Sequence, residues 1–492
     1  MRVLFVVSNL FFSEPMGVLQ LSAICKGRGH IVRLMSLTQH QIGQVLDSFN
    51  PDVVGYSTTS SEEYLFREAD QVVRTWANLT GKRILRVMGG PHPTFFPEVL
   101  DSLELDAICI GDGDKAILRL LDAFAAGNDL TGIPNIATPS ARVPTKEIVS
   151  ELDDLPFPDR EVFYEASPDL MKVGIRGFMT MRGCPHKCTY CFNHAYNKLF
   201  KGDGRKLLRR RSVDNVLAEI KMVIADFPQV RFVRFVDDVF AIFADDWLRE
   251  FADRYPREVG IPFYCLVRPN NMSEEIAQLL AKAGCLHVGM AVESGVEQIR
   301  NDIMKRNMSD AVVKSAFAVA HRYGIRTSGN TMIAIPGTKA EDDYNSYLFT
   351  RSLGMTFPSF GIFVPFPRTE MTEYAVQIGV LDPEFDCGNL RPSLPSALNN
   401  YSEDDKRFQQ NLVFLGPIFC FLPDFMLPVL KMLLRSRLTP LFKPLGGAFV
   451  TWRMTKVFPN SYPRDPITFL KSVFRAMGHF VAPETKPINI RR

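Results

Sequence analysis

The chain has 492 residues and carries 57 Lys and Arg against 54 Asp and Glu, a formal net charge of +3 that excludes nucleic-acid binding driven by overall basicity. Its length predicts two or three domains. Nine cysteines, an odd number, and the lack of a secretory signal at the N-terminus argue against a disulfide framework and favour a reducing, cytoplasmic location.

Residues 1–136 alternate short apolar runs with stretches of helical period. The expected strands are Val3–Val7, Ile31–Met35, Val53–Ser57, Ile84–Met88 and Ala107–Ile110, and the expected helices are Met16–Lys26, Gln39–Phe49, Ser61–Ala77, Phe95–Ser102 and Lys115–Ala126. Strands that alternate with helices predict a parallel sheet covered on both faces, of the flavodoxin-like type.

Small and polar residues follow three of these expected strands. Such sheets bind ligands at the carboxyl ends of their strands, where glycines let a large ligand approach the backbone. The alternative is that these residues form ordinary turns and helix caps. The candidate ligand-binding residues are Ser57, Thr58, Gly89, Gly90, His92, Gly111 and Gly113.

Residues 137–167 lack helical or strand periodicity and are rich in Pro, Asp, Glu and Ser. The segment Leu152–Arg160, reading LDDLPFPDR, predicts an extended linker between two domains.

Residues 168–370 repeat a strand–helix order. The expected strands are Val173–Met181, Val230–Val236, Phe263–Val267, His287–Val292, Thr327–Ala334 and Ser359–Val364, and the expected helices are Val213–Phe227, Asp245–Tyr255, Glu274–Ala283, Ala311–Tyr323 and one that begins at Ala340. This order predicts a partial (β/α)6 barrel, whose chemistry would lie at the carboxyl ends of the strands.

A cysteine motif follows the first of these strands. Residues 181–192 read MRGCPHKCTYCF, which places Cys184, Cys188 and Cys191 in a C-x3-C-x2-C spacing. Three thiolates on one loop can bind three irons of a 4Fe–4S cube and leave the fourth iron open to a chelating substrate. Structural zinc is the alternative, with His186 or His194 as the fourth ligand, but zinc sites usually pair their ligands in C-x2-C units.

The cysteine loop resembles the signature of the radical S-adenosylmethionine (SAM) superfamily. The resemblance implies that the open iron binds the amino and carboxylate groups of SAM and that SAM is cleaved to a 5′-deoxyadenosyl radical. The GGPHPT and GDGD stretches of the N-terminal region are similar to those of the cobalamin-binding domain fused to many radical SAM enzymes. Residues 1–136 are therefore expected to bind cobalamin through the seven candidate residues above.

One feature departs from a well-known cobalamin pattern. Domains that give cobalt a protein histidine carry D-x-H-x-x-G after the first strand, whereas residues 8–17 here read SNLFFSEPMG. The resemblance is to the branch in which cobalt receives no protein imidazole. His92 is expected to orient its loop or to contact the edge of the corrin.

The resemblance also nominates SAM-binding residues at strand ends in the second domain. Glu293 and Ser294, in VGMAVESG, are similar to the family's ribose and methionine contact, and Arg268 could pair with the SAM carboxylate or with a neighbouring helix. Asp238, of the Asp237-Asp238 pair, could position SAM or cap a helix. The full expected set is Tyr190, Phe192, Asp238, Arg268, Glu293, Ser294 and Ile335.

Residues 371–492 form an expected, mainly helical C-terminal extension in which Cys387 and Cys420 stand alone. Residues 412–434 are very apolar, but Pro417, Pro423 and Pro428 interrupt them. A buried helical cap is favoured over a membrane span, and the following Arg435, Arg437 and Lys443 leave an interfacial amphipathic segment as a third interpretation.

The resemblance implies a cobalamin-dependent methyltransferase that acts on an unactivated carbon of a small, hydrophobic or natural-product substrate. The cofactors would be a 4Fe–4S cluster, SAM and cobalamin, and the partners a flavodoxin or ferredoxin electron donor, no nucleic acid, and the membrane surface as a peripheral contact. One alternative is an oxidative cyclase similar to the anaerobic magnesium-protoporphyrin monomethyl ester cyclase. Another is a non-catalytic cobalamin or redox sensor.

Overall fold

The computed structural model describes residues 1–10, 13–200, 207–385 and 390–459. Cys387 and residues 460–492 of the C-terminal extension lie outside the described residues. The chain divides into two compact units, each described by itself below. The first unit contains residues 1–172 together with 199–200 and 207–210, and the second contains 173–198, 211–385 and 390–459.

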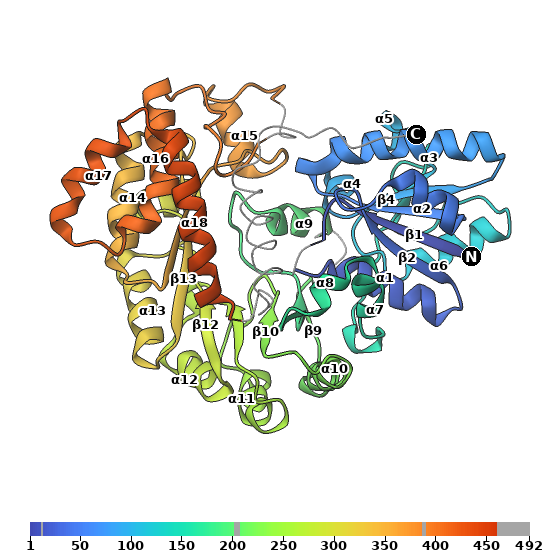
Figure 1. The fold of residues 1–492 in the computed structure, drawn as a ribbon, viewed down its shortest axis with the longest axis horizontal. Coiled ribbons are helices and arrows are strands. Elements are labelled where there is room, and N and C mark those ends of the chain that lie inside the picture. The colour runs from blue at the N-terminus through green and yellow to red at the C-terminus, as the bar shows by residue number, and fades with distance from the viewer. Residues whose placement is uncertain (11–12, 201–206, 386–389, 460–492) are drawn as a thin grey trace. The chain divides into compact units, whose positions relative to one another are not determined.

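The first unit is built on a six-stranded sheet with the order β2-β1-β3-β4-β5-β6 (Figure 1). Its first five strands are parallel, and β6 pairs antiparallel with β5. This order confirms the flavodoxin-like prediction. The strands are β1 (Arg2–Val7), β2 (Ile31–Ser36), β3 (Val53–Ser57), β4 (Leu85–Gly89), β5 (Ala107–Cys109) and β6 (Ile136–Ala137).

Helices cover this sheet because alternate strand residues are buried on each face. Leu4, Val6, Val54 and Tyr56 share one core with α2 and α3, while α1 and α6 contact each other. The helices are α1 (Met16–Gly27), α2 (Ile42–Phe49), η1 (Ser60–Glu62), α3 (Glu63–Thr80), α4 (Pro91–Phe95), α5 (Val99–Ser102), α6 (Ala116–Ala125), η2 (Leu152–Asp154), α7 (Arg160–Ala166) and α8 (Pro168–Met171).

The prediction of one helix over Phe95–Ser102 is wrong. Two short helices, α4 and α5, occupy this region instead, and Pro97 lies between them. Proline lacks the amide hydrogen that a helix interior requires, and its ring clashes with the preceding turn.

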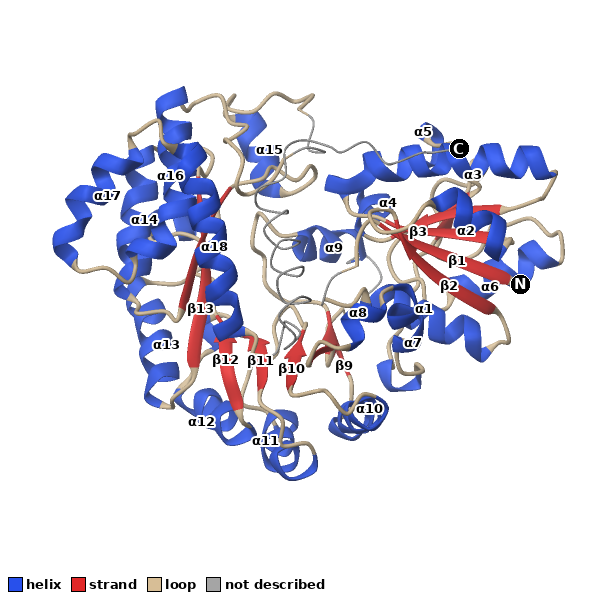
Figure 2. Cartoon of the chain, viewed as in Figure 1, coloured by secondary structure: helices blue, strands red, loops and turns tan. Residues whose placement is uncertain are grey.

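The second unit contains an entirely parallel sheet with the order β14-β13-β12-β11-β10-β7 (Figure 2). Helices follow the strands in alternation, as the (β/α)6 prediction requires. Its strands are β7 (Ile175–Phe178), β10 (Phe232–Phe235), β11 (Phe263–Leu266), β12 (Cys285–Gly289), β13 (Arg326–Ile333) and β14 (Phe357–Ile362). Two further strands of two residues each, β8 (Met181–Arg182) and β9 (Arg209–Arg210), do not belong to this sheet, and β9 lies in the first unit.

Four helices of this unit, α10, α11, α12 and α13, begin at capping residues. Ser212, Asp245, Ser273 and Ser309 each accept a hydrogen bond from the backbone amide three residues later, which satisfies a donor that the first turn leaves free. The helices are α9 (Phe192–Phe200, whose last two residues belong to the first unit), α10 (Val213–Asp226), α11 (Asp246–Glu258), η4 (Pro269–Asn271), α12 (Glu274–Ala283), the π-helix η5 (Ile299–Ile303), α13 (Asp310–Arg322), α14 (Ala340–Ser352) and α15 (Glu370–Gln377).

Two expected strands are shorter than their apolar runs. The strand expected over His287–Val292 ends at Gly289, although Met290 and Val292 remain fully buried in the core between sheet and helices. The strand expected over Val173–Met181 ends at Phe178, because the amides of Thr180 and Met181 donate to the Asp237 carboxylate instead of to a strand. An apolar run in the sequence indicates buried residues. Buried residues can continue beyond the last residue that is hydrogen-bonded to a neighbouring strand, so the run is longer than the strand.

The C-terminal extension packs against the edge strand of this sheet. Helices α16 (Glu403–Phe419) and α18 (Thr439–Val457) contact each other and β14, while η6 (Asp424–Met426) and α17 (Leu427–Leu434) connect them. Leu412, Leu415 and Leu430 are fully or almost fully buried. The buried helical cap favoured above is therefore found for part of the apolar segment, whereas Phe425 and Met432 within it are 76% and 65% exposed. Among the described residues, no helix has the length and apolar character needed to span a bilayer.

Candidate functional site

The cysteine loop begins where β7 ends and is fixed there by Asp237. One carboxylate oxygen of Asp237 accepts from the amides of Thr180 and Met181, both at 2.7 Å, and the other accepts from the Thr180 hydroxyl at 3.1 Å. Asp237 is 1% exposed. It is not the helix cap weighed from sequence, since α11 is capped by Asp245.

The three cysteines lie together on this loop and are all free thiols. Burial raises the pKa of the Cys184 thiol, and it raises that of Cys191 to about 11. Arg268 and Arg306 both lie close enough to interact electrostatically with Cys188. The positive charge of Arg268 also opposes the rise in the pKa of the Cys184 thiol, which suits a loop whose thiolates hold an iron–sulfur cluster.

A buried polar network lies under the cysteine loop. The Tyr190 hydroxyl donates to the Glu293 carboxylate at 3.0 Å and accepts from Arg306 at 2.5 Å. Arg306 also donates to the Ala291 carbonyl at 2.8 Å, and its guanidinium lies 3.8 Å from Glu293. Burial raises the pKa of Glu293, and the positive charge of Arg306 opposes that rise. The structure thus brings together two predicted residues, Tyr190 and Glu293, with one that the sequence did not reveal.

Three buried nitrogen atoms near the loop have no hydrogen-bond partner within the described part of the chain. They are His186 Nε2, Arg268 Nε and Arg306 Nε. Arg268 donates to the Arg306 carbonyl at 2.5 Å and pairs with no carboxylate among the described residues. Buried donors without partners cost free energy, so the two guanidinium nitrogens fit a ligand rich in acceptor oxygens, such as a carboxylate.

Asp238 and His194 face different surroundings. Asp238 is open to solvent, but enough protein surrounds it for desolvation to raise its pKa, and Asn193 donates to it.

His194, weighed above as a fourth zinc ligand, instead contacts Glu370 at 3.0 Å. No three His, Cys, Asp or Glu side chains of the described residues are grouped to hold a single metal ion. Phe192 begins α9, and its ring lies 5.3 Å from that of Phe366.

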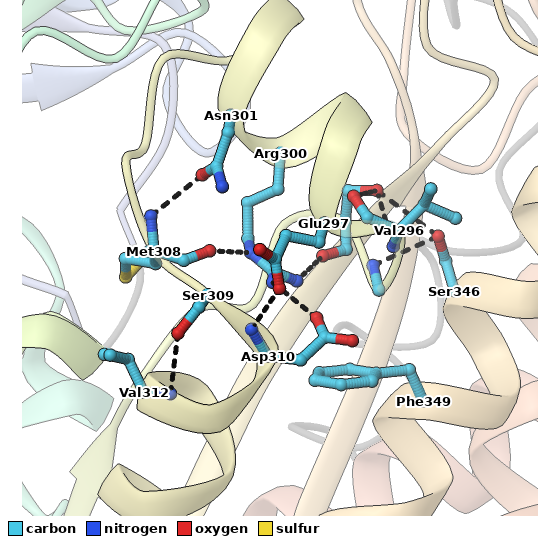
Figure 3. Close-up of polar contacts among 12 residues, drawn as sticks. Val296, Glu297, Arg300, Asn301, Met308, Ser309, Asp310, Val312, Ser346 and Phe349 are labelled. Carbon is cyan, nitrogen blue, oxygen red and sulfur yellow. Dashed lines mark hydrogen bonds and ion pairs between the residues drawn. The ribbon is translucent and has the colours of Figure 1, made fainter.

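Polar contacts from Arg300 and Ser346, both labelled in Figure 3, fix the Glu293-Ser294-Gly295 turn. Arg300 of the π-helix, fully buried, donates to the Ser294 carbonyl at 2.8 Å and the Met308 carbonyl at 3.0 Å, and it pairs with Asp310 at 2.5 Å. The Gly295 amide donates to Ser346 of α14 at 3.1 Å. The Ser294 hydroxyl also lies 3.4 Å from that of Ser346, so it is engaged by the helical layer. Glu293 itself has a φ of 66°, a left-handed backbone conformation that β-strands do not adopt.

The cysteine loop is tied to the same π-helix. Thr189 donates through its hydroxyl to the Ile303 carbonyl at 2.8 Å, and through its amide to Met304 at 3.3 Å. Single turns of π-helix recur at functional sites. One short segment therefore positions both the cysteine loop and the Glu293 turn.

Ile335 follows β13 and is buried beneath residues of the C-terminal extension. Its carbonyl accepts from the hydroxyls of Tyr401 and Thr338, each at 2.9 Å. Its side chain is 2% exposed, so both the carbonyl and the side chain of Ile335 are engaged by the protein itself.

In the first unit, the seven candidate residues lie at or just beyond the carboxyl ends of β3, β4 and β5. Thr58 is 1% exposed, and its hydroxyl has no partner among the described residues. Gly90 has a φ of 98°, and a Cβ there would lie 2.9 Å from the Thr58 carbonyl. The buried Thr58 hydroxyl is available to bond a ligand, and Gly90 beside it can be replaced by no larger residue without strain. Together they fit a large polar ligand that approaches the backbone.

His92 and Gly111 are used by the protein itself. His92 lies 3.2 Å from the Ser60 hydroxyl and stacks on Phe96, and burial lowers its pKa to about 4. A Cβ at Gly111 would lie 2.4 Å from the Phe200 ring, so this glycine makes room for Phe200. Gly113 has only ordinary contacts, with Leu21 and Cys109, and the Ser57 hydroxyl lies beside Gly90.

Comparisons with known proteins match each unit to a family. Residues 178–347 match the Radical SAM superfamily, and residues 3–121 match the B12 binding domain.

Three relatives are named as methyl-transferring enzymes. An uncharacterized methyltransferase of Pyrococcus horikoshii is 26% identical over 387 residues, 75% of this chain and 79% of the relative. The cytidylyl-2-hydroxyethylphosphonate methyltransferase of Streptomyces wedmorensis is 26% identical and covers 71% of each chain. The hopanoid C-3 methylase of Methylococcus capsulatus is 23% identical over 73% of this chain and 68% of its own.

Two solved structures share the fold. The radical SAM methyltransferase TsrM of Kitasatospora setae, with cobalamin and a [4Fe-4S] cluster bound, matches with a TM-score of 0.66 at 16% identity, over 97% of this chain and 99% of that one. The cobalamin-dependent radical enzyme OxsB matches with a TM-score of 0.67 at 16% identity, over 97% and 75%.

Proposed function

Because the chain is a radical SAM enzyme with a B12-binding domain, we propose that it methylates an unactivated carbon of a small, hydrophobic or natural-product substrate. Its cofactors are a 4Fe–4S cluster, SAM and cobalamin. The observation that carries the proposal is the loop of Cys184, Cys188 and Cys191 beside the buried network of Tyr190, Glu293 and Arg306.

When bound, the cluster and SAM supply a 5′-deoxyadenosyl radical that removes a hydrogen atom from the substrate, and cobalamin supplies the methyl group that replaces it. The chain's own residues bind and orient these groups. The three thiolates hold the cluster, and the unpaired nitrogens of Arg268 and Arg306 are suited to the SAM carboxylate.

Glu293 is suited to accept hydrogen bonds from the SAM ribose. It is held by Tyr190 and Arg306, so its orientation is fixed before any ligand arrives. Preorganised polar groups lose little free energy to reorganisation when they bind. Thr58 and the Gly90 turn are suited to a polar edge of cobalamin.

The hydrophobic substrate is supported by a relative of this chain, which is named for methylation of a hopanoid. We propose a flavodoxin or ferredoxin as electron donor.

A second function keeps the same radical chemistry but omits methyl transfer. A match to the anaerobic magnesium-protoporphyrin IX monomethyl ester cyclase of Synechocystis, 25% identical, supports it, but only over 36% of this chain. The three relatives named for methyl transfer each cover about twice as much of the chain.

The test is anaerobic reconstitution with iron, sulfide, cobalamin, a reductant and methyl-labelled SAM. Methyl transfer predicts that both 5′-deoxyadenosine and S-adenosylhomocysteine form and that the label enters the product. Formation of 5′-deoxyadenosine without S-adenosylhomocysteine would favour the cyclase-like function. Absence of both would contradict the proposal.

A further inference from the structure

Helix α18 carries an exposed apolar stripe. Leu441, Leu445 and Trp452 are 65%, 55% and 54% exposed. They are four and seven residues apart, and at 3.6 residues per turn they fall within about 40° of each other around the helix. The opposite side of α18 packs on α16, where a Cβ at Gly446 would lie 2.7 Å from the Phe414 carbonyl oxygen.

The stripe continues onto neighbouring segments. The ring of Phe449 lies 5.7 Å from that of Trp452 and 6.0 Å from that of Phe421, which is 44% exposed. Phe425 in η6 and Met432 in α17 are 76% and 65% exposed. Seven of the sixteen large apolar side chains that are exposed among the described residues thus lie between 421 and 452. We call these seven residues the C-terminal apolar surface, namely Phe421, Phe425, Met432, Leu438, Leu441, Leu445 and Trp452.

The segment that carries most of this surface is rich in cations, and Asp424 is the one carboxylate between its first residue, Phe421, and its last, Trp452. Residues 425–459 contain no Asp or Glu and six cations, namely Lys431, Arg435, Arg437, Lys443, Arg453 and Lys456. Asp424, just before them, is paired with Arg351 at 2.6 Å. Arg435, Arg437 and Lys443 have no carboxylate partner among the residues that the structure describes. Exposed apolar side chains with cations beside them are complementary to the interface of an anionic bilayer.

We propose that the C-terminal apolar surface docks on anionic lipid membranes, with Leu441, Leu445 and Phe425 entering the acyl boundary and Arg435 and Arg437 contacting lipid headgroups. A second copy of the chain is a poorer partner, because a symmetric interface would bring these cations together. The proposal is linked to the proposed function at one point: a hydrophobic substrate would be taken up from the membrane at this surface.

The test is co-sedimentation of the full-length chain with lipid vesicles. Binding is expected with phosphatidylcholine–phosphatidylglycerol vesicles, weaker binding with phosphatidylcholine alone, and release by salt. Each removed cation should lower the partition coefficient about fivefold, so the double variant Arg435→Gln, Arg437→Gln should lose about 25-fold. The variant Leu441→Gln, Leu445→Gln should lose binding to both kinds of vesicle.

The matched control is Leu79→Gln with Val143→Gln, which changes side chains that are 83% and 87% exposed in the first unit. It should bind like the unchanged chain. The proposal is overturned if anionic vesicles are not bound, if the control loses binding equally, or if light scattering shows that the Leu441, Leu445 variant instead dissociates an oligomer. Vesicle binding tests the membrane proposal without any turnover by the enzyme. Methyl transfer can be measured with a detergent-dispersed substrate and no membrane. The two proposals can therefore fail independently of each other.

Discussion

Arg306 is the residue on which the polar network of the candidate site depends. Its guanidinium contacts Tyr190, Glu293 and the Ala291 carbonyl, and its own carbonyl accepts from Arg268. All of these groups lie around the cysteine loop and the Glu293 turn. A buried carboxylate such as Glu293 is tolerated only while a cation and hydrogen-bond donors compensate it.

Replacing Arg306 should therefore destabilise the second unit. In Arg306→Met, Glu293 loses its cation and remains buried, and removal of one partner of a buried pair costs about 3–5 kcal/mol. Thermal unfolding under anaerobic conditions should show a clear fall in Tm, and adding Glu293→Gln should restore part of it. Arg249→Met, which removes exposed ion pairs, should cost no more than about 1 kcal/mol. Equal losses in the two variants would show that Arg306 is not the centre of a buried network.

At the scale of single elements, the Glu293 turn depends on a close approach to α14. A Cβ at Gly295 would lie 2.6 Å from Ser346 Cα and 2.7 Å from Phe349 Cβ. The Gly295 amide also donates to Ser346. The turn can hold Glu293 in place only while α14 packs directly on the glycine.

We expect Gly295→Ala to push the turn from α14. Overpacking typically costs about 1–3 kcal/mol, and the displacement of Glu293 should raise the KM for SAM while cluster content stays unchanged. Gly43→Ala in α2 is the matched control, because nothing lies within 4 Å of its added Cβ, and it should stabilise the first unit by up to about 1 kcal/mol. A Gly295→Ala variant with an unchanged Tm and KM would contradict the close packing.

A second element-scale feature is the buried carboxyl of Asp343 between α14 and α16. It accepts from the Ala334 amide and from Gln409, both at 2.8 Å. Burial raises its pKa to about 7 from a usual value of 3.8. The folded chain thus holds this proton more tightly than the unfolded chain. The resulting stability is complete below about pH 4 and is lost as the pH rises to about 7.

Asp343→Asn should remove this pH dependence. The Asn amide can donate to Gln409 Oε1, which has no partner among the described residues. The Tm of the variant relative to the unchanged chain should therefore rise between pH 5 and pH 8, each unit of the removed pKa shift being worth about 1.4 kcal/mol. Asp404→Asn, at the exposed start of α16, should leave the pH profile unchanged. A difference in Tm that is constant with pH would show that Asp343 titrates normally.

The elements were largely predictable from sequence, but the contacts of the site were not. Alternating strands and helices predict both sheets, and a carboxylate after the β12 region predicts Glu293. Arg306 lies thirteen residues further on, after a π-helix, where no period or motif marks it. A Cβ at Gly111 would meet the ring of Phe200, 89 positions later, and no local pattern predicts that contact. Sequence patterns report burial and local conformation, whereas partners distant in the chain appear only after folding.

At the scale of the whole molecule, the candidate cofactor residues divide between the two units. Thr58 and Gly90 belong to the first unit, and the cysteines, Glu293 and Arg306 belong to the second. Each unit has its own sheet and its own buried core. Loading of cobalamin and assembly of the cluster should therefore be separable by single substitutions.

We expect Gly90→Ala to lose cobalamin but keep its cluster, because a Cβ there meets the Thr58 carbonyl and a φ of 98° is strained for alanine. Gly132→Ala, with a φ of 79° and nothing within 4 Å, is the control that carries backbone strain without the contact, and it should keep both cofactors. Cys188→Ala should show the opposite result, with iron falling from about four atoms per chain to background while cobalamin is retained. Iron analysis and the cobalamin absorption spectrum of the full-length chain measure both quantities on one sample. Loss of both cofactors in both variants would show that the two sites form only together, and would contradict the assignment of each to its own unit.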